Sequence, residues 1–342
     1  MDFSQNNYLL TIFIPTYNRA NYLHDTLAMF KRYISELDME KIIQIIVGNN
    51  NSNDHTADVI SSFEYSEFTG YNNYENIGIT QNILKGLTLS AGKYLWIYGD
   101  DDDVHANVFK GIINDLKEGK TQLIKLQSQT CPNPSIFKTV TGEKSYQTYC
   151  LSRETFDKKN FSREERKAGF ITSLIYNRNI LENVLSEFYK SSDYNDSYKM
   201  NNYFCKTFTL LYFDKVKAYL RSTKVTIAAR AFEGGSHFLK DSDIYFKTFF
   251  LDELECYEYY KSSHADLYRL SINSYYNKSN ILYNLKMYNC FDKRVIKRYF
   301  ENLNLLDVTV ALKYLLLMCV PRFLVILRFK SLPKLKSCIV KA

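Results

Sequence analysis

Short, continuously apolar segments alternate with amphipathic segments through the first 130 residues, and this alternation constrains the fold most strongly. Continuous apolar strands are typical of parallel sheets that helices cover on both faces. The sequence therefore predicts an α/β fold with a mainly parallel, Rossmann-like sheet flanked by helices. The expected strands are Leu9–Ile14, Ile42–Val47, Tyr94–Tyr98 and Gln122–Leu126, and the expected helices are Ala20–Glu36, Asp54–Ser62, Ile79–Leu89 and Val104–Lys117.

The pattern changes in the later part of the chain. It loosens between Cys131 and Lys167, which indicates a long loop, and strands are expected again in GFITSLIY and KVTIAAR. After about Asp241 the pattern is helical. A chain of 342 residues can hold one large domain or two. We expect a first domain over 1–235, with halves 1–130 and 131–235, and a helical C-terminal region over 236–342.

The net charge of +7 is concentrated at the C-terminus, where Phe291–Ala342 carries eleven Lys/Arg and three Asp/Glu. The rest of the chain is close to neutral, which disfavours a nucleic-acid partner, because such proteins usually spread their charge over one face. The seven cysteines form no CxxC pair, so neither a zinc site nor a disulfide framework is indicated. With no secretory leader at the N-terminus, the sequence predicts a reduced, cytoplasmic protein.

The last forty or so residues form a basic amphipathic tail with two interpretations. Its longest uncharged apolar run, Tyr314–Pro321, is far shorter than the roughly 20 residues of a membrane-spanning helix. The tail could lie on the inner face of the cytoplasmic membrane as a peripheral contact, with its basic side chains on anionic lipids. Its apolar face could instead pack on the first domain, or on a second subunit of a homodimer.

Four consecutive aspartates, Asp100–Asp103, follow a predicted strand and Gly99. Adjacent carboxylates repel one another unless a positive group lies among them. Alternate residues of an extended chain face the same way, so Asp100 and Asp102 could converge on one cation. Hard oxygen ligands suit Mn²⁺ or Mg²⁺. A solvated acidic loop is one alternative, and a helix start whose dipole favours aspartate is another.

Three further polar motifs lie at the ends of predicted strands, where ligands bind in such sheets. They are IFIPTYNRANYL (Ile12–Leu23), IIVGNNNSNDHT (Ile46–Thr56) and NIGITQNILKGLTLSAGKYLWIYGDDD (Asn76–Asp102). In this order and spacing they resemble the nucleotide-sugar-binding half of family 2 glycosyltransferases, which have the GT-A fold. The resemblance covers about residues 8–130. With GFITSLIYNR further on, the chain is most similar to bacterial transferases of surface-polysaccharide assembly, including the abequosyltransferase-like branch.

The resemblance implies a metal-dependent, inverting transfer of a sugar from a nucleoside diphosphate sugar to a hydroxyl of a glycan or lipid-linked acceptor. Mn²⁺ or Mg²⁺ is the implied cofactor, and a UDP-sugar is the favoured donor. Asp100 and Asp102 match the aspartates of the family's DxD motif, with Asp102 the better metal ligand, and His237 is a candidate third ligand. The implied donor-binding residues are Pro15, Thr16, Tyr17, Arg19, Asn49, Asn76, Gly78, Asn82, Asp100 and Asp101.

The chain departs from the family pattern at three positions. Asn49 stands where an aspartate commonly recognises the base, and Gln81 stands where many members have an arginine. Asp103 is an additional aspartate, which we expect to cap the next helix. Asn49 and Gln81 keep open the alternative of a non-catalytic binding or scaffold protein. A sugar nucleotidyltransferase is disfavoured, because FIPTYNRANY has no glycine after the first strand.

The residue that takes the proton from the acceptor hydroxyl is the least defined part of the pattern. Asp196 and Asp193, in SSDYNDSY, fall roughly where the family's acceptor-side acid is expected. Glu233, in RAFEGGSHF, is another candidate. Each of them could equally be an ordinary surface acid.

Overall fold

The computed structural model describes residues 8–119, 121–131, 146–152, 170–190, 211–212, 215–216, 218–230, 254, 268–269, 272–273, 276, 297 and 299–319. The chain divides into two compact units. The first comprises Met1–Asp157 and Lys167–Ala231, and the second comprises Lys158–Arg166 and Phe232–Ala342. The predicted domain boundary at residue 235 lies outside the described residues and stays a prediction.

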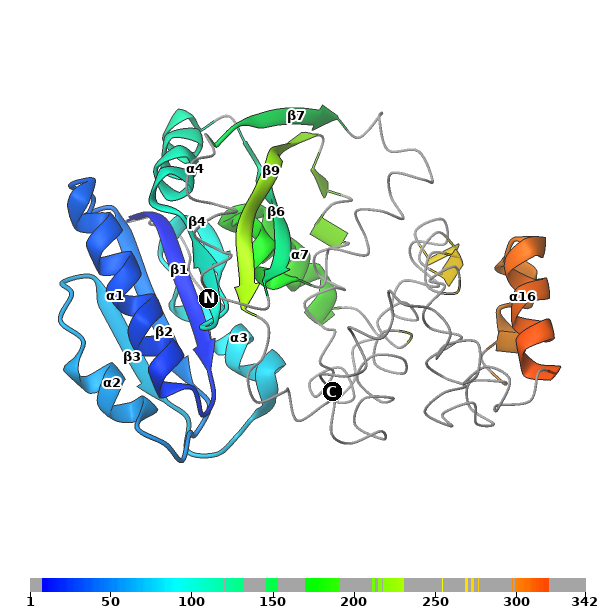
Figure 1. Ribbon diagram of the computed structural model, residues 1–342, viewed down its shortest axis with the longest axis horizontal. Coiled ribbons are helices and arrows are strands. Elements are labelled where there is room, and N and C mark those ends of the chain that lie inside the picture. The colour runs from blue at the N-terminus through cyan, green and yellow to red at the C-terminus, as the bar shows by residue number, and fades with distance from the viewer. Residues whose placement is uncertain are drawn as a thin grey trace. The chain divides into compact units, whose positions relative to one another are not determined.

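Four parallel strands form the N-terminal half of the sheet (Figure 1). β1 pairs with β2 on one side and with β4 on the other, and β3 pairs with β2. β2 is buried along its whole length and β1 along most of it, which is why their sequences are continuously apolar. The strands are β1 Tyr8–Thr16, β2 Ile43–Asn49, β3 Phe68–Asn72 and β4 Gly92–Ile97.

The other half of the sheet is largely antiparallel. β8 pairs antiparallel with β4 and β6, β9 runs parallel to β6, and β5 and β7 pair antiparallel with β9. The predicted parallel arrangement is therefore confirmed for the N-terminal half, whereas the complete sheet is mixed. These strands are β5 Asp102–Val104, β6 Leu123–Cys131, β7 Thr148–Ser152, β8 Leu174–Asn177 and β9 Ala218–Arg230.

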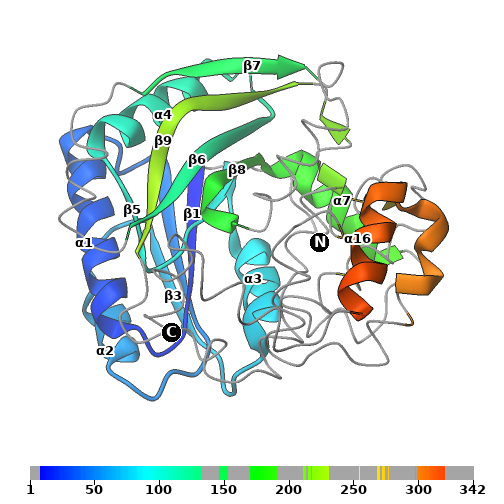
Figure 2. The same cartoon turned by 45° about the vertical axis from the view of Figure 1, so that its right-hand side comes forward.

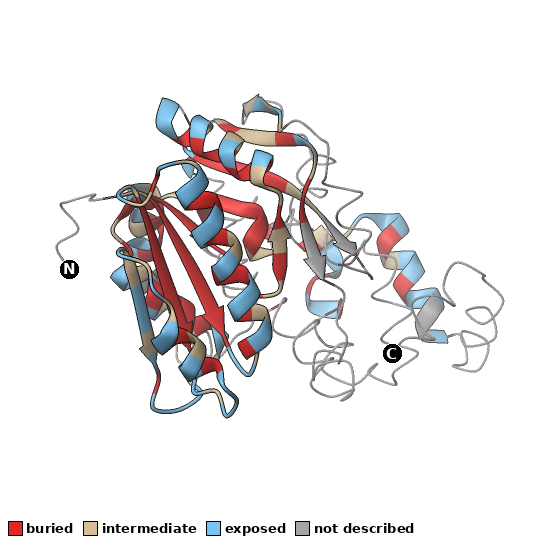
Figure 3. Cartoon of the chain, turned by 60° about the vertical axis from the view of Figure 1, so that its left-hand side comes forward, coloured by how far each residue is buried: buried red, intermediate tan, exposed pale blue. Residues whose placement is uncertain are grey.

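Helices cover both faces of the sheet, with α1 and α3 on opposite sides of β1 (Figure 2). On the α1 face, Phe30 makes edge-to-face contacts with Trp96 and Tyr98. On the other face, α3 packs so closely that a Cβ on Gly86 would lie 2.2 Å from the Phe13 ring. Figure 3 shows the central strands buried and the outer faces of the helices exposed. The helices are α1 Ala20–Glu36, α2 Thr56–Ser62, α3 Gly78–Leu89, α4 Ala106–Glu118 and α7 Arg178–Lys190.

One expectation about the acidic run is wrong. Asp103 does not cap the following helix, because residues 102–104 form β5 and pair with β9 more than a hundred residues later. The helix begins instead at Ala106. Its N-cap is His105, whose Nδ1 accepts a hydrogen bond from the Asn107 N–H at 3.2 Å.

The described residues of the second unit are helical or lie in turns, as predicted for this region. They include the 3₁₀ turn η4 Leu303–Leu305 and the helix α16 Val308–Cys319. Tyr299 and Tyr314 stack with their ring centroids 5.4 Å apart, and Tyr276 meets both rings edge-on. Within the described part of the chain, every helix is too short or too polar to cross a bilayer. The basic tail beyond Cys319 lies outside the described residues.

Candidate active site

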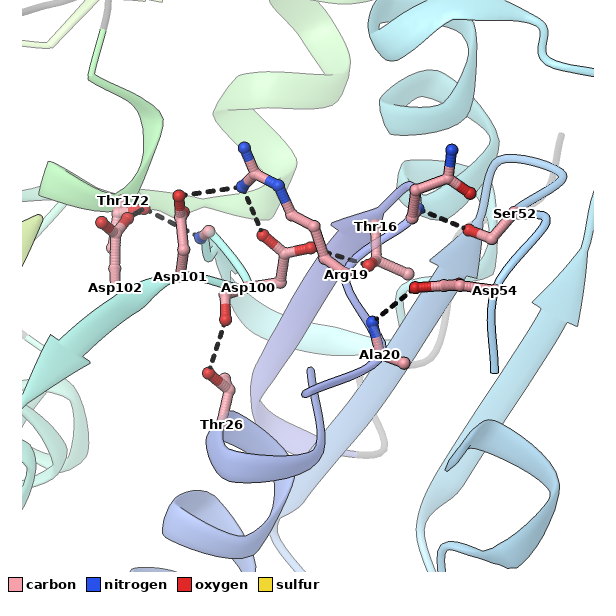
Figure 4. Close-up of polar contacts among 12 residues, drawn as sticks. Thr16, Arg19, Ala20, Thr26, Ser52, Asp54, Asp100, Asp101, Asp102 and Thr172 are labelled. Carbon is pink, nitrogen blue, oxygen red and sulfur yellow. Dashed lines mark hydrogen bonds and ion pairs between the residues drawn. The ribbon is translucent and has the colours of Figure 1, made fainter. Parts of the chain in front are cut away.

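β4 brings the chain to the carboxyl edge of the parallel strands, where Gly99–Asp102 form a tight turn that we name the acidic turn (Figure 4). The Asp102 N–H donates to the Gly99 carbonyl at 3.2 Å. From α1, the buried hydroxyl of Thr26 donates to the Asp100 carbonyl at 2.8 Å. These bonds fix the backbone of the acidic turn against the neighbouring strand and helix.

The side chain of Asp100 is almost fully buried beneath the end of β1. Its Oδ2 accepts a hydrogen bond from the Thr16 hydroxyl at 2.7 Å, and its Oδ1 accepts one from Arg19 at 2.8 Å. Burial disfavours the charged form of the carboxyl and raises the pKa of Asp100 to about 6, even though Arg19 and Thr16 oppose the shift. Asp100 is therefore held in place, but its negative charge is incompletely compensated.

Asp102 is equally buried and is held from the opposite side. Its Oδ2 accepts a hydrogen bond from the hydroxyl of Thr172, which itself accepts from the Gly99 N–H at 2.9 Å. Burial raises the pKa of Asp102 well above its ordinary value, and the nearby Asp101 charge adds to the shift. A Cβ on Gly99 would lie 2.5 Å from Asp102 Oδ2, so this arrangement requires glycine there.

Arg19 is a positive group among the four aspartates. One of its terminal nitrogens, Nη1, lies 2.8 Å from Asp100 Oδ1 and 2.9 Å from Asp101 Oδ2, so it bridges the two carboxylates (Figure 4). Among the side chains of Arg19 and Asp100–Asp102, three carboxylates face one guanidinium. If all three are ionised, this group carries two uncompensated negative charges.

The acidic turn fits a divalent cation in its chemistry. Its donors are hard carboxylate oxygens, and the remaining charge of the group equals that of one Mn²⁺ or Mg²⁺. The described residues contain no preformed cluster of three or more metal-binding side chains. In sites of this kind Mg²⁺ usually binds through one or two carboxylates together with substrate phosphates. Asp100, Asp101 and Asp102 are the residues that would hold the ion.

A network of asparagine amides forms the adjoining edge, at the ends of β2 and β3. Asn50 donates to Asn76 Oδ1 at 2.7 Å, and Asn73 donates to Asn50 at 3.2 Å and to Asn82 at 3.0 Å. The Asn82 amide donates in turn to the Gly48 carbonyl at 2.7 Å. Asn82 thus lies inside the protein as a link between α3 and β2, a role that the sequence did not suggest.

Asn49, the predicted base-recognising residue, is also tied into this edge. Its Oδ1 accepts from the backbone N–H of Ser52 at 3.1 Å and from the Ser52 hydroxyl at 2.6 Å, and its amide donates to Asn72 at 2.8 Å. Its place at the end of β2 is as expected. Its contact with a base stays a prediction.

The loops after β1 and β2 are locked to each other. The Asn18 N–H donates to the Ser52 hydroxyl at 2.8 Å, and the Asn53 N–H donates to Asn18 Oδ1 at 2.7 Å. Asp54 accepts from the N–H of Ala20, at the start of α1, and from the N–H of Thr56, at the start of α2. Burial pushes the pKa of Asp54 upward, but hydrogen bonds from the Thr56 hydroxyl and from these two N–H groups outweigh it and hold the pKa below its ordinary value.

The structure describes the predicted donor-site residues and leaves four of the candidate residues undescribed. Thr16 and Arg19 meet the acidic turn directly. Gly78 begins α3 with a φ of 78° that favours glycine, and its N–H donates to Asn76 Oδ1 at 3.0 Å. Pro15 lies within β1, and Tyr17 is partly exposed just beyond it. Asp193, Asp196 and His237, like Glu233, lie outside the described residues, so their roles stay predictions.

Thr172 is the site residue that sequence reasoning missed. It lies in the 3₁₀ turn η2 Ile171–Ser173, just before β8. It is fully buried, and its carbonyl also accepts a hydrogen bond from the Trp96 indole N–H at 2.8 Å. Thr172 lies in the segment GFITSLIYNR, which is part of the family resemblance. The resemblance implies no role for any residue of this segment.

A comparison with protein families decides what kind of chain this is. The family described as "Glycosyl transferase family 2" matches residues 11–192, which is more than half of the 342 residues. The chain belongs to glycosyl transferase family 2. Membership confirms the resemblance, and the observed sheet flanked by helices is the GT-A fold that it implied.

Curated relatives in this family match over short segments. Abequosyltransferase RfbV of Salmonella typhimurium is 32% identical over 101 residues, which cover 28% of this chain and 28% of that protein. An uncharacterized glycosyltransferase of Mycoplasma pneumoniae is 28% identical over 118 residues, covering 32% of this chain and 36% of that one. The matches thus span between 28% and 36% of these relatives' lengths.

Among solved structures, the crystal structure of residues 1–349 of S. aureus TarS in complex with UDP-GlcNAc is similar, with a TM-score of 0.48 and 12% identity. The match covers 82% of this chain and 81% of that chain. The full-length S. aureus TarS structure gives a TM-score of 0.47 and 13% identity, over 84% of this chain and 50% of that chain.

The raised pKa of Asp100 predicts a pH dependence of folding stability. The pKa of this carboxyl is about 6 in the folded protein against an ordinary 3.8, so the folded state binds the proton more tightly. Its stabilising contribution is complete below about pH 4 and is lost as the pH rises through about 6. In denaturant titrations with EDTA, wild type should lose on the order of 3 kcal/mol relative to Asp100→Asn across this range.

Asp54→Asn provides a control of opposite sign. Because the pKa of Asp54 is lowered by folding, wild type should gain stability relative to this variant as the pH rises from below 3.8. Parallel pH profiles for wild type and Asp100→Asn would show that the Asp100 carboxyl is not desolvated in this way.

Proposed function

We propose that this chain is a metal-dependent, inverting glycosyltransferase that moves a sugar from a nucleoside diphosphate sugar to a hydroxyl of a glycan or lipid-linked acceptor. One observation carries the proposal. In a chain of glycosyl transferase family 2, a turn with three aspartates is held at the carboxyl edge of the parallel strands, and two of these carboxylates are buried with raised pKa values. A bound cation can neutralise desolvated carboxylates at such a ligand-binding edge.

In this proposal the protein positions charge around the donor's diphosphate. A divalent cation at the carboxylates of the acidic turn would supply Lewis-acid stabilisation of the negative charge on the departing phosphate. Thr16 and Thr172 orient the carboxylates before any ligand arrives, so little reorganisation is needed. Tyr17 and Asn49 lie on the same edge of the sheet and would face the nucleoside.

Inversion requires a base on the acceptor side of the sugar. We assign it to the segment that holds Asp193 and Asp196, with Glu233 as the alternative. A carboxylate there would take the proton from the attacking hydroxyl while the acidic turn stabilises the leaving group on the other side.

We further propose that the donor is a UDP-sugar. A thermal-shift screen of UDP, GDP, CDP and dTDP with Mn²⁺ tests this choice, because a ligand at 100 times its Kd stabilises the folded state by about 2.7 kcal/mol. Preferential stabilisation by UDP supports the assignment. The neutral Asn49 in the base position is the reason for including the other three nucleotides.

A non-catalytic binding protein is the second candidate. The observation that favours it is the ion-pairing of Arg19 with two of the three aspartates proposed to take the cation. Hydrolysis of nucleotide sugars without an acceptor separates the two candidates, because transferases often transfer the donor sugar slowly to water. Binding of UDP with Mn²⁺ but no hydrolysis and no transfer would favour the binding protein.

Asp102→Asn should abolish Mn²⁺-dependent hydrolysis and transfer while preserving the fold. The amide can still accept from Thr172, and it removes a buried charge, so thermal stability without metal should not fall. By analogy with losing one preorganised electrostatic group, kcat should drop at least about 100-fold. The measurement is release of UDP from UDP-sugars in saturating Mn²⁺, with circular dichroism as the test of folding.

Asp103→Asn is the matched control, because Asp103 is adjacent, carries the same charge and lies in β5 opposite Ala228. This variant should keep near wild-type activity. Full activity of Asp102→Asn, or of wild type in excess chelator, would refute the metal role.

We also propose that the protein contacts the inner face of the cytoplasmic membrane, in the assembly of a surface polysaccharide such as capsule or O-antigen. The similarity to an abequosyltransferase supports the polysaccharide context. The surface of α16 supports the membrane contact, because Val308, Leu312 and Leu316 are exposed at helical spacing. The 23 residues that follow α16 carry six Lys/Arg and no Asp/Glu, which suits an anionic lipid surface.

Replacing Leu312 and Leu316 together by asparagine should weaken binding to vesicles of phosphatidylcholine with phosphatidylglycerol. Two leucines that no longer enter the lipid surface should cost at least about tenfold in affinity, measured by flotation. Thr309→Asn on the same helix leaves the leucines intact and serves as the control. Equal flotation of all three proteins would remove α16 from the membrane contact.

A further inference from the structure

The ion pairs of Arg19 and the proposed cation site use the same oxygen atoms. The Nη1 atom of Arg19 lies 2.8 Å from Asp100 Oδ1 and 2.9 Å from Asp101 Oδ2. Asp100 Oδ2 is already engaged with Thr16 at 2.7 Å. A carboxylate oxygen that accepts a hydrogen bond from a guanidinium has less capacity to coordinate a metal. The two positive groups would also repel each other at contact distance.

Arg19 is positioned to move. It precedes α1 directly, and its side chain is 31% exposed, whereas the side chains of Asp100 and Asp101 are 4% and 18% exposed. Its backbone is fixed, because the N–H groups on either side, of Asn18 and Ala20, donate to the Ser52 hydroxyl and to Asp54. The long side chain can therefore change partners without any change in the loop that carries it.

We propose that Arg19 is the resident counter-ion of the acidic turn, and that a divalent cation displaces its guanidinium, which then binds the diphosphate of the donor. This inference rests on the metal-dependent function proposed above. The guanidinium stabilises the buried carboxylates until the cation arrives, and it lowers the affinity for the cation in doing so. Once displaced, it is at the edge of the site, and its planar fork matches phosphate oxygens.

If this exchange occurs, Arg19 lowers the affinity for the divalent cation and raises the affinity for the diphosphate. Before the donor binds, its positive charge competes with the cation for Asp100 and Asp101. After the cation binds, the same charge attracts the diphosphate. A residue that only stabilised the fold would affect both ligands in the same direction, so the opposite signs identify the exchange.

The test measures the binding of each ligand to the full-length protein by calorimetry. Arg19→Gln removes the charge and keeps much of the length, so Mn²⁺ alone should bind at least about tenfold more tightly than to wild type. With Mn²⁺ saturating, UDP should bind about tenfold more weakly. Arg32→Gln is the matched control, because Arg32 lies on the exposed side of α1 near Glu36, and it should change neither affinity.

A second measurement uses wild type and does not depend on the variant folding. Phenylglyoxal modifies accessible arginines, and peptide mass spectrometry reports the rate at Arg19, with Arg32 as the internal reference. Mn²⁺ alone should increase the modification rate at Arg19 several-fold, and adding UDP should reduce it again. An unchanged rate at Arg19 with bound Mn²⁺ would overturn the proposed displacement.

The outcomes separate this inference from the function on which it rests. Equal Mn²⁺ affinity for wild type and Arg19→Gln overturns the exchange but leaves the metal site intact. Absence of Mn²⁺ binding to either protein overturns both. Tighter Mn²⁺ binding together with weaker UDP binding in Arg19→Gln supports both.

Discussion

The hydrogen bonds that hold Asp100 and Asp102 are the interactions on which the rest of the site depends. Burying a carboxylate is costly unless it is paired or hydrogen-bonded. Here Thr16 on β1 donates a hydrogen bond to Asp100, and Thr172, just before β8, donates one to Asp102. These donors come from the two sides of β4, so the acidic turn is fixed where the parallel half of the sheet meets the antiparallel half. The raised pKa values indicate that the hydroxyls and Arg19 do not fully offset the burial. The negative charge of the two carboxylates is therefore incompletely compensated by these groups.

The remainder of the edge provides a rigid frame for a ligand. Loops usually vary and move, but those after β1 and β2 share hydrogen bonds through Asn18, Ser52 and Asn53. The asparagine network joins the ends of β2 and β3 to the start of α3. Amides can donate and accept at once, so the asparagines satisfy one another's buried groups, and Lys85 Nζ adds a hydrogen bond to Asn73 Oδ1 at 2.8 Å.

Local patterns predicted most of the parallel half. The strands β1 and β2 are buried on both faces and read as continuous apolar runs, and α1 is buried on one face and reads as an amphipathic helix. β3 was missed, since its sequence FTGYN is half exposed and lacks an apolar run. β5 was missed because its pairing with β9 comes from a distant part of the chain. The same limit applied to the site. The sequence predicted Arg19 and the aspartates as neighbours of one ligand, but not that Arg19 bridges two of them. The hydrogen bond between Asp102 and Thr172 joins residues that are 70 positions apart, so no local sequence pattern predicts it.

We propose that the acidic turn holds a divalent cation that also binds the diphosphate of a nucleotide. The decisive experiment is anomalous diffraction from a crystal of the full chain grown with Mn²⁺ and UDP. We expect a manganese peak about 2.1 Å from a carboxylate oxygen of Asp100, Asp101 or Asp102, with a diphosphate oxygen on the same ion. UDP bound with no manganese at the acidic turn, and with Arg19 still bridging Asp100 and Asp101, would contradict it.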